Sequence, residues 1–335
     1  MTLLSTTISE KSASSMRARF GDQNTIPLES FIDWALYDKN LGYYQKNKIR
    51  VGKSLQSDFY TSSSFHKLWA ELVLASSITL VGDQDLQKYT FVEIAAEPEC
   101  CLFSCLTHPF GDYKVIRLGK DLVIPPLSIV YSNEWLDAQP FRRFSYSKQG
   151  GSWHEHAVKT QGTKIREIIM DKPVKLEDGI FSDDINQTQD GYIIDWPTGA
   201  HRALQNLLQS SDWKGWFLTF DYGFRTKSEI LENKPEGSGR AYLNHTQHNN
   251  ILQDPGDQDI TCHLCWETLI EILEQNNFQD ISLQSQESFL MHHAAGKLEE
   301  IINQGTQADI NQAKELIHPH YLGQKFQAIA GKRGV

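Results

Sequence analysis

The chain has 335 residues, of which 40% are hydrophobic and 22% are charged, as is ordinary for a protein with a sizeable core. This length allows one large α/β domain with insertions or two smaller domains. The net charge of -10 argues against general nucleic-acid binding, because a phosphate backbone needs a basic surface, and it leaves a basic protein partner open.

Several features of the sequence favour a cytoplasmic location without membrane contact. The first residues have neither the basic nor the apolar region of a secretory signal. No segment approaches the roughly 20 apolar residues of a membrane-spanning helix. The five cysteines are an odd number in a long chain, which favours a reducing compartment over a disulfide framework.

The N-terminal part of the chain predicts two helices. Residues 1–20 begin rich in Ser and Thr without periodicity, so we expect a disordered N-terminus. A helix is predicted over 27–37, where Pro27 suits a first turn and apolar residues form one face. A second helix is predicted over 64–80 from the three- and four-residue spacing of its apolar residues, after a polar loop at 57–62.

Short apolar runs predict buried strands at 89–94, 113–118, 127–132 and 216–220. Helical or loop crossovers separate them, which indicates a parallel sheet. Between the third and fourth strands, the segments 142–147 and 153–158 flank Lys148-Gln-Gly-Gly-Ser, a hairpin signal. The remaining predictions are a polar β-rich stretch at 159–195, helices at 199–208 and 264–275, a strand near 281–283, and a closing helical pair at 298–303 and 311–317.

The third predicted strand ends in Asn133-Glu-Trp-Leu-Asp-Ala-Gln-Pro140. In open α/β sheets, ligands bind at the carboxyl ends of the strands, so Glu134 and Asp137 are candidate site carboxylates. Such carboxylates can orient a cationic guanidinium and draw electron density toward its attacking nitrogen. The alternative is that both residues only cap the following helix.

An ordered set of motifs carries a family resemblance. The set comprises the helix and turn at 31–44, Asp-Phe-Tyr-Thr-Ser at 58–62, the segment 133–140, Phe-Asp-Tyr-Gly at 220–223, Arg240 with Tyr242 and His245, and Pro-Gly-x-x-Asp-Ile-Thr at 255–261. In this order they resemble the MidA-like methyltransferases, a family that includes the mitochondrial protein-arginine methyltransferase acting as a complex I assembly factor. The resemblance covers about residues 25 to 330.

The resemblance implies an α/β fold with a Rossmann-like class I methyltransferase core at 21–140 and 216–335 and an N-terminal helical segment. Residues 141–215 would be an inserted β-hairpin and helical region that forms a substrate cleft. The implied cofactor is S-adenosylmethionine, and the implied acceptor is a protein arginine oriented by Glu134 and Asp137. The implied cofactor-binding residues are Asp58, Tyr60, Thr61, Ser62, Glu93, Ala95, Asn133, Asp221, Tyr222 and Gly223. The implied cleft residues are Tyr242, His245, Thr261 and His263.

The sequence departs from the family pattern at the donor side. The family's first strand ends in a Glu-x-Gly-x-Gly-x-Gly turn, but here Ala95, Glu97 and Glu99 stand at the glycine positions. Ala95 would be tolerated at negative φ, whereas Glu97 adds bulk and charge. At the end of the second strand, Arg117 stands where an acidic residue would accept hydrogen bonds from ribose hydroxyls.

Two functional hypotheses therefore stay open. The first is a methyltransferase acting on a protein arginine. The second is a catalytically inactive pseudo-methyltransferase that binds a partner protein as an assembly or scaffold factor.

Other motifs favour structural roles, and no metal is expected. Cys262-His-Leu-Cys265 has metal-ligand spacing, but it starts an amphipathic helix, which favours buried free thiols. His154-Glu-His156 could place two imidazoles on one side of a strand, where a solvated face is the favoured interpretation. His292-His293 is interpreted as a strand end beside a helix start.

Overall fold

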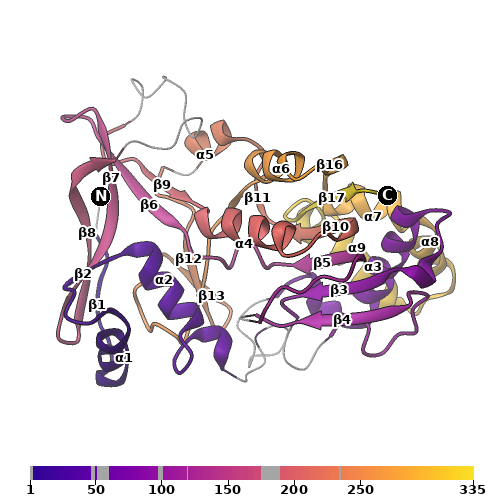
Figure 1. Cartoon of the computed structure of the whole chain (residues 1–335), viewed down its shortest axis with the longest axis horizontal. Coiled ribbons are helices and arrows are strands. Elements are labelled where there is room, and N and C mark those ends of the chain that lie inside the picture. The colour runs from indigo at the N-terminus through magenta and orange to yellow at the C-terminus, as the bar shows by residue number, and fades with distance from the viewer. Residues whose placement is uncertain are drawn as a thin grey trace. The chain divides into compact units, whose positions relative to one another are not determined.

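The computed structural model of the chain describes residues 3–46, 50, 60–96, 101–118, 120–174, 189–233 and 235–335. The chain forms two compact units, each assembled from three segments (Figure 1). Unit 1 comprises Met1–Asn47, Leu136–Ala203 and Gly223–Thr268, and unit 2 comprises Lys48–Trp135, Leu204–Tyr222 and Leu269–Val335. Each unit has a hydrophobic core of its own.

Unit 2 is built around a six-stranded sheet with the order β16-β17-β10-β5-β3-β4. Its strands are β3 (Thr90–Ile94), β4 (Asp112–Ile116), β5 (Leu127–Asn133), β10 (Lys214–Asp221), β16 (Gln279–Ser285) and β17 (Gln327–Arg333). The predicted parallel sheet is confirmed for β4, β3, β5 and β10, whereas β17 is antiparallel to both of its neighbours. β3 lies between β4 and β5, so the direction in which strands are added reverses at β3, which makes this a topological switch point.

Helices of unit 2 pack on the sheet through a large aromatic core. They are α3 (His66–Val81), α7 (Gln286–His293), α8 (Ala295–Gln304) and α9 (Gln307–Ile317), with short turns η2 (Ser62–Phe65), η3 (Leu86–Lys88) and η5 (Pro319–Gly323). Trp69 of α3 packs edge-on against Phe220 at 4.8 Å, and its indole N–H donates to the Tyr131 hydroxyl at 2.8 Å. This buried hydrogen bond satisfies both polar groups inside an otherwise apolar core.

The helical pair predicted near the C-terminus corresponds to α8 and α9. The interpretation of His292 and His293 as a strand end is wrong, because both residues form the last turn of α7. The sequence pattern also missed β17, which is paired on both sides within the sheet.

Unit 1 is built around a second six-stranded sheet, in which all pairs are antiparallel. Its strands are β1 (Ser5–Thr7), β2 (Thr25–Pro27), β6 (Arg142–Ser147), β7 (Ser152–Gln161), β8 (Lys164–Val174) and β9 (Ile193–Trp196). The predicted hairpin is confirmed, since Phe144 pairs with Glu155 and Tyr146 with Trp153. Helix α2 (Leu28–Tyr37) packs into the core of this unit with Phe31, Ile32 and Leu36 almost fully buried.

Smaller elements complete unit 1 and its junctions. They are α1 (Glu10–Phe20), η1 (Tyr43–Gln45), α4 (Thr198–Gln209), β11 (Gly223–Phe224), α5 (Lys227–Asn233), β12 (Arg240–Leu243), β13 (Thr246–His248), β14 (Asp259–Thr261), β15 (Leu264–Cys265) and α6 (Trp266–Gln275). The helix predicted over 264–275 starts two residues later, because Leu264 and Cys265 pair with β11 instead.

The expectation of a disordered N-terminus over 1–20 is wrong. Ser5–Thr7 pairs with β8, and Ser9 caps α1 by accepting the Ser12 backbone N–H at 3.0 Å. Ala13 and Met16 of this helix are buried in the core of unit 1. The pairing partner lies about 160 residues away in the sequence (Ser5 with Arg166), so no local sequence pattern predicts the pairing.

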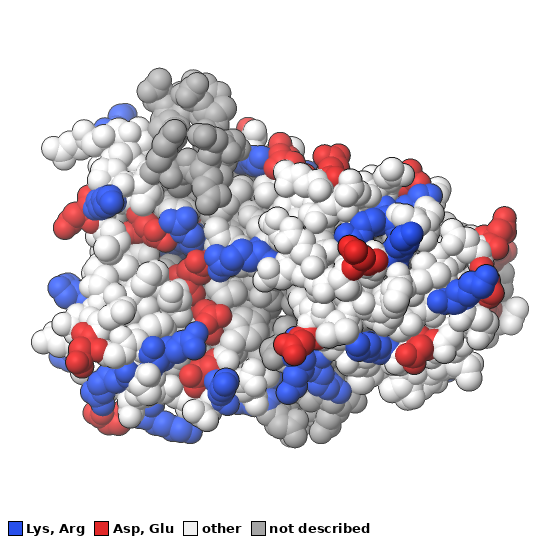
Figure 2. All heavy atoms as spheres, viewed as in Figure 1, with Lys and Arg blue, Asp and Glu red and all other residues white. Residues whose placement is uncertain are grey.

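The two compact units do not follow the domain boundaries that the resemblance predicts. Helix α2 and residues 223–268 are compact with residues 141–203, not with the sheet of unit 2, whereas residues 204–215 of the predicted insertion belong to unit 2. No helix within the described residues is long and apolar enough to cross a membrane. On the face drawn in Figure 2, basic and acidic side chains are interspersed.

Candidate functional site

The switch point of the unit 2 sheet has an unusual backbone on two adjacent strands. Ala95, the residue after β3, has φ 62°, and Glu134, the residue after β5, has φ 48°. Ala95 donates its backbone N–H to Ile116 at 2.8 Å, and Glu134 donates its own to Phe220 at 2.9 Å. Non-glycine residues in this region are strained and cluster at functional sites, and switch points are where ligands bind. We therefore define the switch-point site by the strand ends at Ala95, Arg117, Asn133 and Glu134.

Asn133 holds the Glu134 side chain at this site. Its amide donates to Glu134 Oε1 at 2.8 Å and to Ser63 Oγ at 3.2 Å. Asn133 and Glu134 are partly exposed, so the carboxylate is oriented yet accessible. The alternative that Glu134 caps a following helix is wrong, because no helix follows β5 before β6.

The loop before α3 contributes packing through two of its predicted cofactor-binding residues. The Thr61 side chain accepts the Ser63 N–H, and the Ser62 hydroxyl donates to Gln286 at 2.8 Å. Thr61 and Ser62 are buried, and the Tyr60 hydroxyl bonds Glu315. Thr61 and Ser62 thus hold Ser63 beside Asn133, while Asp58 lies outside the described residues.

Glu93 anchors the backbone behind the site. Its buried carboxylate accepts the Leu102 N–H at 2.9 Å and a hydrogen bond from the Tyr113 hydroxyl. Burial raises the pKa of Glu93, and these hydrogen bonds and the charge of Arg117 only partly counter the rise. Its carboxylate therefore secures the chain after the turn.

The turn after β3 corrects one prediction. Ala95 was expected to be tolerated at negative φ, but its positive φ is the conformation that glycine adopts at least cost. The chain has thus kept the backbone of a glycine turn while adding a side chain to it. Glu97 and Glu99 lie outside the described residues, and the described residues from 101 to 111 form turns without a helix.

Arg117 lies at the carboxyl end of β4 and is tied to this same turn. Its guanidinium donates to the Ala96 carbonyl at 3.0 Å and lies 3.5 Å from the Cys101 sulfur. Guanidinium groups have donors only, so the position offers a positive charge where the resemblance implied an acceptor.

The remaining cofactor prediction concerns the end of β10. Asp221 is fully buried and accepts the N–H of Tyr222, whose ring packs on Phe326 at 5.8 Å. Gly223 belongs to unit 1, where a Cβ would lie 2.4 Å from the Leu264 carbonyl oxygen. Close packing against β15 thus accounts for this glycine.

In unit 1, tyrosines of the opening motif contact two other motifs. Tyr37 donates its hydroxyl to the Ala138 carbonyl at 2.8 Å, and Tyr44 donates to Asp259 at 2.9 Å. The two rings stack at 5.4 Å. Burial, reinforced by nearby carboxylates such as Asp259, raises the pKa of both phenols, so they remain donors.

The predicted acceptor residues of unit 1 are only partly accessible. Asp137 is 3% exposed, and its backbone carbonyl accepts the Cys262 N–H at 3.0 Å, next to Thr261, which is also buried. His263 is partly exposed and stacks on Phe224 at 5.2 Å. Tyr242 is partly exposed on β12, and His245 is exposed at the tip of the β12–β13 hairpin with φ 59°. Asp137 and Glu134 belong to different units, and each is placed within its own unit.

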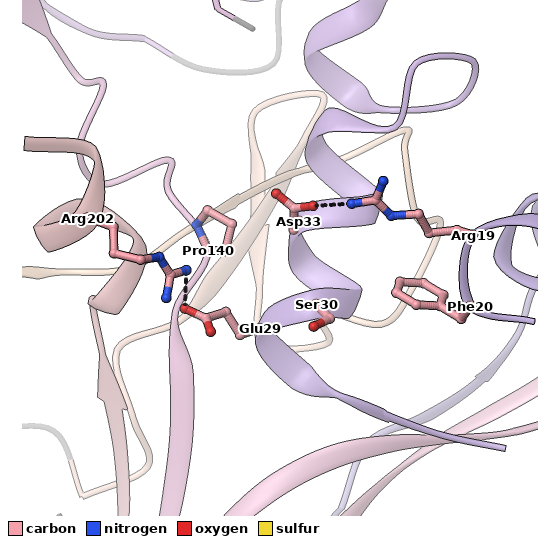
Figure 3. Close-up of a pocket in the computed structure, with 7 residues that line it drawn as sticks. All are labelled: Arg19, Phe20, Glu29, Ser30, Asp33, Pro140 and Arg202. Carbon is pink, nitrogen blue, oxygen red and sulfur yellow. Dashed lines mark hydrogen bonds and ion pairs between the residues drawn. The ribbon is translucent and has the colours of Figure 1, made fainter. Parts of the chain in front are cut away.

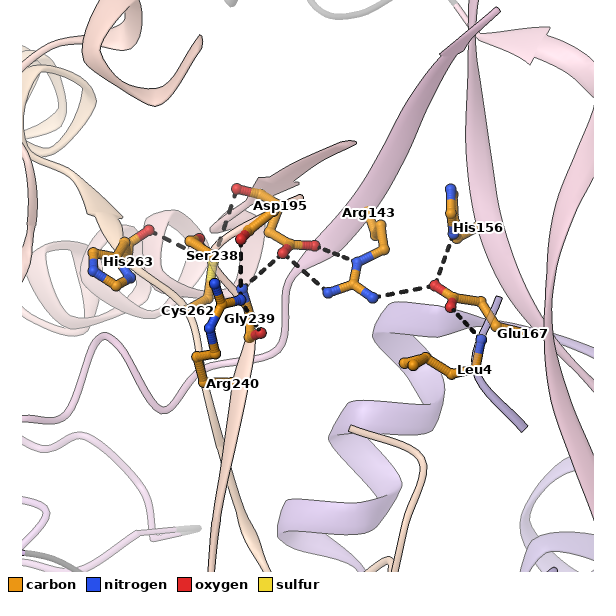
Figure 4. Close-up of polar contacts among 11 residues, drawn as sticks. Leu4, Arg143, His156, Glu167, Asp195, Ser238, Gly239, Arg240, Cys262 and His263 are labelled. Atoms are coloured by element: carbon orange, nitrogen blue, oxygen red, sulfur yellow. Dashed lines mark hydrogen bonds and ion pairs between the residues drawn. The ribbon is translucent and has the colours of Figure 1, made fainter. Parts of the chain in front are cut away.

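A buried ionic network in unit 1 was missed by sequence reasoning (Figure 4). Arg143 donates to Asp195 at 2.7 Å and to Glu167 at 3.2 Å, and His156 lies 2.7 Å from Glu167. Asp195 also accepts the Gly239 N–H at 2.7 Å. These charges are buried yet mutually paired, as buried charges must be.

His156 was expected on a solvated strand face together with His154, and for His156 this is wrong. A register shift in the pairing of β7 with β8 falls between the two histidines. The bulge breaks the two-residue alternation, and His156 is 1% exposed. Cys262 and Cys265 are free and buried, as predicted, and the described residues contain no cluster of metal-ligating side chains.

A pocket of about 170 Å³ lies in unit 1 beside α2 (Figure 3). Glu29 accepts from Arg202 at 2.8 Å, and Asp33 accepts from Arg19 at 3.4 Å. Pro140 of the Asn-Glu-x-x-Asp-Ala-x-Pro motif forms part of its wall. Because each carboxylate already pairs with an arginine, the pocket has no net charge to offer a ligand.

Comparison with known proteins agrees with this fold. Residues 118–282 match a family model described as "Putative S-adenosyl-L-methionine-dependent methyltransferase". A "likely methyl transferase" from Burkholderia thailandensis, crystallised with S-adenosyl-homocysteine, has a TM-score of 0.81 and 20% identity, over 97% of this chain and 93% of that one. A native structure of an uncharacterised protein of the same superfamily from Burkholderia thailandensis has a TM-score of 0.74 and 19% identity, over 97% and 92%. Comparison with the curated proteins gives no match.

The chain therefore has the Rossmann-like fold of S-adenosylmethionine-dependent methyltransferases, and the matched model supports the MidA-like resemblance that its motifs carry.

Proposed function

We propose that this protein is an S-adenosylmethionine-dependent methyltransferase that acts on a protein side chain, with arginine as the acceptor. The observation that carries the proposal is Glu134, a partly exposed carboxylate in a strained backbone at the switch point. A strained conformation persists only where the surrounding structure enforces it, and such positions gather at active sites.

The residues of the switch-point site fit S-adenosylmethionine, the methyl donor, in part. The positive φ of Ala95 keeps the turn through which a backbone can approach a ligand closely. Glu134 and Asn133 offer polar groups at the strand end, whereas Arg117 offers no acceptor for ribose hydroxyls. When bound, S-adenosylmethionine would supply an electrophilic methyl group.

The role of Glu134 follows from its chemistry. A carboxylate held by Asn133 can accept charge-assisted hydrogen bonds from a guanidinium and so orient the nitrogen that is to be methylated. The carboxylate also favours localisation of the positive charge on the other nitrogens of the guanidinium. The nitrogen that is to be methylated thereby gains electron density. An arginine-containing peptide from a basic protein is the acceptor that this group would suit, and the net charge of -10 favours such a partner.

A specific observation favours a second candidate, a pseudo-methyltransferase that binds a partner protein without catalysis. Arg117 bonds the Ala96 carbonyl at 3.0 Å, at the end of the sheet where the donor's ribose would lie. A guanidinium fixed there disfavours the binding of S-adenosylmethionine without affecting the carboxylate of Glu134.

Calorimetric titration of the purified protein with S-adenosylmethionine separates the two candidates. Micromolar binding would support the methyltransferase. Absence of heat at millimolar ligand, with folding confirmed by circular dichroism, would contradict it and favour the pseudo-methyltransferase.

A substitution tests the role of Glu134. E134Q should reduce methylation of an arginine-rich peptide by about 100-fold, the lower range for loss of such a group, while leaving the affinity for S-adenosylmethionine within a few-fold. E299Q, which changes an exposed carboxylate on α8 of the same unit, serves as the control. Equal methylation rates for E134Q and E299Q would contradict the assignment, and mass spectrometry of the peptide provides the readout.

A further inference from the structure

Ser63 contacts the amide group that holds the Glu134 carboxylate. Its Oγ accepts a hydrogen bond from Asn133 Nδ2 at 3.2 Å, and the same Nδ2 donates to Glu134 Oε1 at 2.8 Å. All three residues belong to unit 2, so the arrangement lies within one compact unit. Ser63 is not among the site residues that the resemblance implies, yet it is joined to Glu134 through a single amide group.

Only the donor side of the Asn133 amide is hydrogen-bonded within the described residues. The amide must present its nitrogen to Glu134, because an ionised carboxylate accepts hydrogen bonds and donates none. Its oxygen, Oδ1, is buried and accepts no hydrogen bond in the described part of the chain. The contacts of Nδ2 with Ser63 and Glu134 therefore set the rotation of the amide, and loss of the Ser63 hydroxyl would leave only the second of them.

The turn that carries Ser63 is itself fixed. The Ser63 N–H donates to Thr61 Oγ1 at 3.2 Å, and the Thr61 N–H donates to Ser64 Oγ at 3.0 Å. Ser62 is buried, and its hydroxyl donates to Gln286 of α7 at 2.8 Å. A side chain can orient another only where its own position is determined by its surroundings. The turn η2 gives Ser63 such a position.

A carboxylate held in one plane can distinguish a guanidinium from an ammonium group. A guanidinium is planar, and its fork of donors fits both oxygens of a carboxylate, whereas an ammonium group is a point charge with rotatable donors. Rotation of the carboxylate would therefore weaken the contact with a guanidinium more than the contact with an ammonium group. A carboxylate has about four acceptor positions, so the hydrogen bond from Asn133 does not prevent Glu134 from accepting such a fork.

We propose that Ser63 is a positioning residue, which fixes the plane of the Glu134 carboxylate through Asn133 and thereby makes the switch-point site select a guanidinium over an ammonium group. The inference rests on the proposed function in taking Glu134 as the carboxylate that orients an arginine. It does not require that S-adenosylmethionine binds.

The test compares a short basic peptide that contains one arginine with its lysine analogue, by calorimetry on the full chain. The unsubstituted protein should bind the arginine peptide about tenfold more tightly, the factor that one additional charge-assisted hydrogen bond supplies. S63A should reduce this preference to about twofold or less and change the affinity for the lysine peptide by less than about twofold. S63T, which keeps the hydroxyl, should restore the preference.

A substitution in the same turn provides the control. S64A removes the hydroxyl that accepts the Thr61 N–H and leaves the contact of Ser63 with Asn133 in place. It should lower the stability of the protein to urea but keep the arginine preference. An equal loss of preference in S64A and S63A would show that any loosening of the turn has this effect, and it would overturn the inference.

The remaining outcomes separate this inference from the proposed function. A preference that E134Q abolishes and S63A keeps would overturn the inference alone, whereas a preference that survives E134Q would contradict the role of Glu134. Loss of the preference in both variants, without S-adenosylmethionine binding, would support the inference and contradict the methyltransferase. Equal affinities of the unsubstituted protein for the two peptides would overturn the inference.

A second variant keeps the test decisive should S63A not fold by circular dichroism. S63C has a similar shape, but its thiol is a weak acceptor. It should lose the arginine preference as S63A does, and persistence of the preference would overturn the inference.

Discussion

Ala95 and Glu134 are single residues that their backbone conformation, more than their side chains, marks as unusual. Each adopts positive φ directly after a strand of the parallel sheet. For an L-residue with a side chain, this conformation costs roughly 1–2 kcal/mol. The sheet must enforce it, since both backbone N–H groups are bonded to neighbouring strands.

Restoring glycine at position 95 should stabilise the protein. A95G removes the steric cost of the left-handed conformation, although it also increases the entropy of the unfolded chain, so we expect a net gain of about 0.5–1 kcal/mol in the free energy of unfolding. Urea unfolding followed by circular dichroism measures the change. A96G is the matched control, because Ala96 is outside the positive-φ set and its substitution should be destabilising. Destabilisation by A95G equal to that by A96G would contradict this account.

Arg117 also shows why a residue must be judged with its contacts. From the sequence it is a basic residue in place of an acidic one. In the structure it also bonds the Ala96 carbonyl, so the substitution alters both the charge of the site and the support of its turn.

At the scale of elements, unit 1 depends on strands that share one buried set of charges. Arg143 of β6 pairs with Asp195 of β9 and Glu167 of β8, and His156 of β7 joins through Glu167. Glu167 also accepts the Leu4 N–H at 3.1 Å, which ties down the N-terminal segment. Removing one member would leave its buried partners without part of their compensation, and breaking a buried ion pair in this way costs up to about 3–5 kcal/mol.

This network predicts acid sensitivity of unit 1. Burial by itself would raise the pKa of Glu167, but the hydrogen bond from His156 and the charge of Arg143 lower it to about 2. A carboxyl whose folded pKa is depressed stabilises the fold above its unfolded pKa, near 4.5, and this contribution is lost as the pH falls toward 2. The shift corresponds to roughly 3 kcal/mol.

Urea unfolding at pH 7, 4.5 and 3 measures this dependence. E167Q should lower the stability at pH 7 and flatten its decline below pH 4.5, because the titrating group is gone. D171N changes an exposed carboxylate on the same strand and should keep the decline. An equally steep decline in E167Q would show that other groups cause the acid sensitivity.

At the scale of the whole molecule, the four cysteines that the structure describes lie in different environments. Cys105 is exposed and Cys101 partly exposed in unit 2, whereas Cys262 and Cys265 are buried in unit 1. Burial raises the pKa of both buried thiols, and nearby Asp195 adds to the rise for Cys262. A buried thiol with a raised pKa offers little of the reactive thiolate.

Alkylation should separate these thiols. With iodoacetamide at pH 8, we expect Cys105 to react at least about 100-fold faster than Cys262 and Cys265 in the folded protein. In urea the rates should converge, which provides the control. Peptide mass spectrometry gives the rate at each site, and rapid labelling of Cys262 without urea would contradict its burial.

Local pattern sufficed for much of the fold. The apolar runs at 89–94, 113–118, 127–132 and 216–220 became β3, β4, β5 and β10, and the Gln-Gly-Gly turn became the β6–β7 hairpin. Strand β1 was not predictable, because its partner β8 is distant in the sequence, and the β7 bulge was not, because it depends on the register of β7 with the neighbouring strand β8. At the candidate site, the sequence identified Glu134 from its place at a strand end, but it did not reveal the positive φ that marks the residue.

The sequence by itself determined the order of elements, the motifs and the chemistry of the residues, since periodicity and residue type act over a few positions. Only the tertiary structure decided that residues 223–268 are compact with the antiparallel sheet, that His156 is buried, and that Ala95 is left-handed. It also decided that Arg117 contacts the turn after β3. Each of these depends on which distant segments pair and pack together, because backbone hydrogen bonds and burial are satisfied across the fold rather than along the chain.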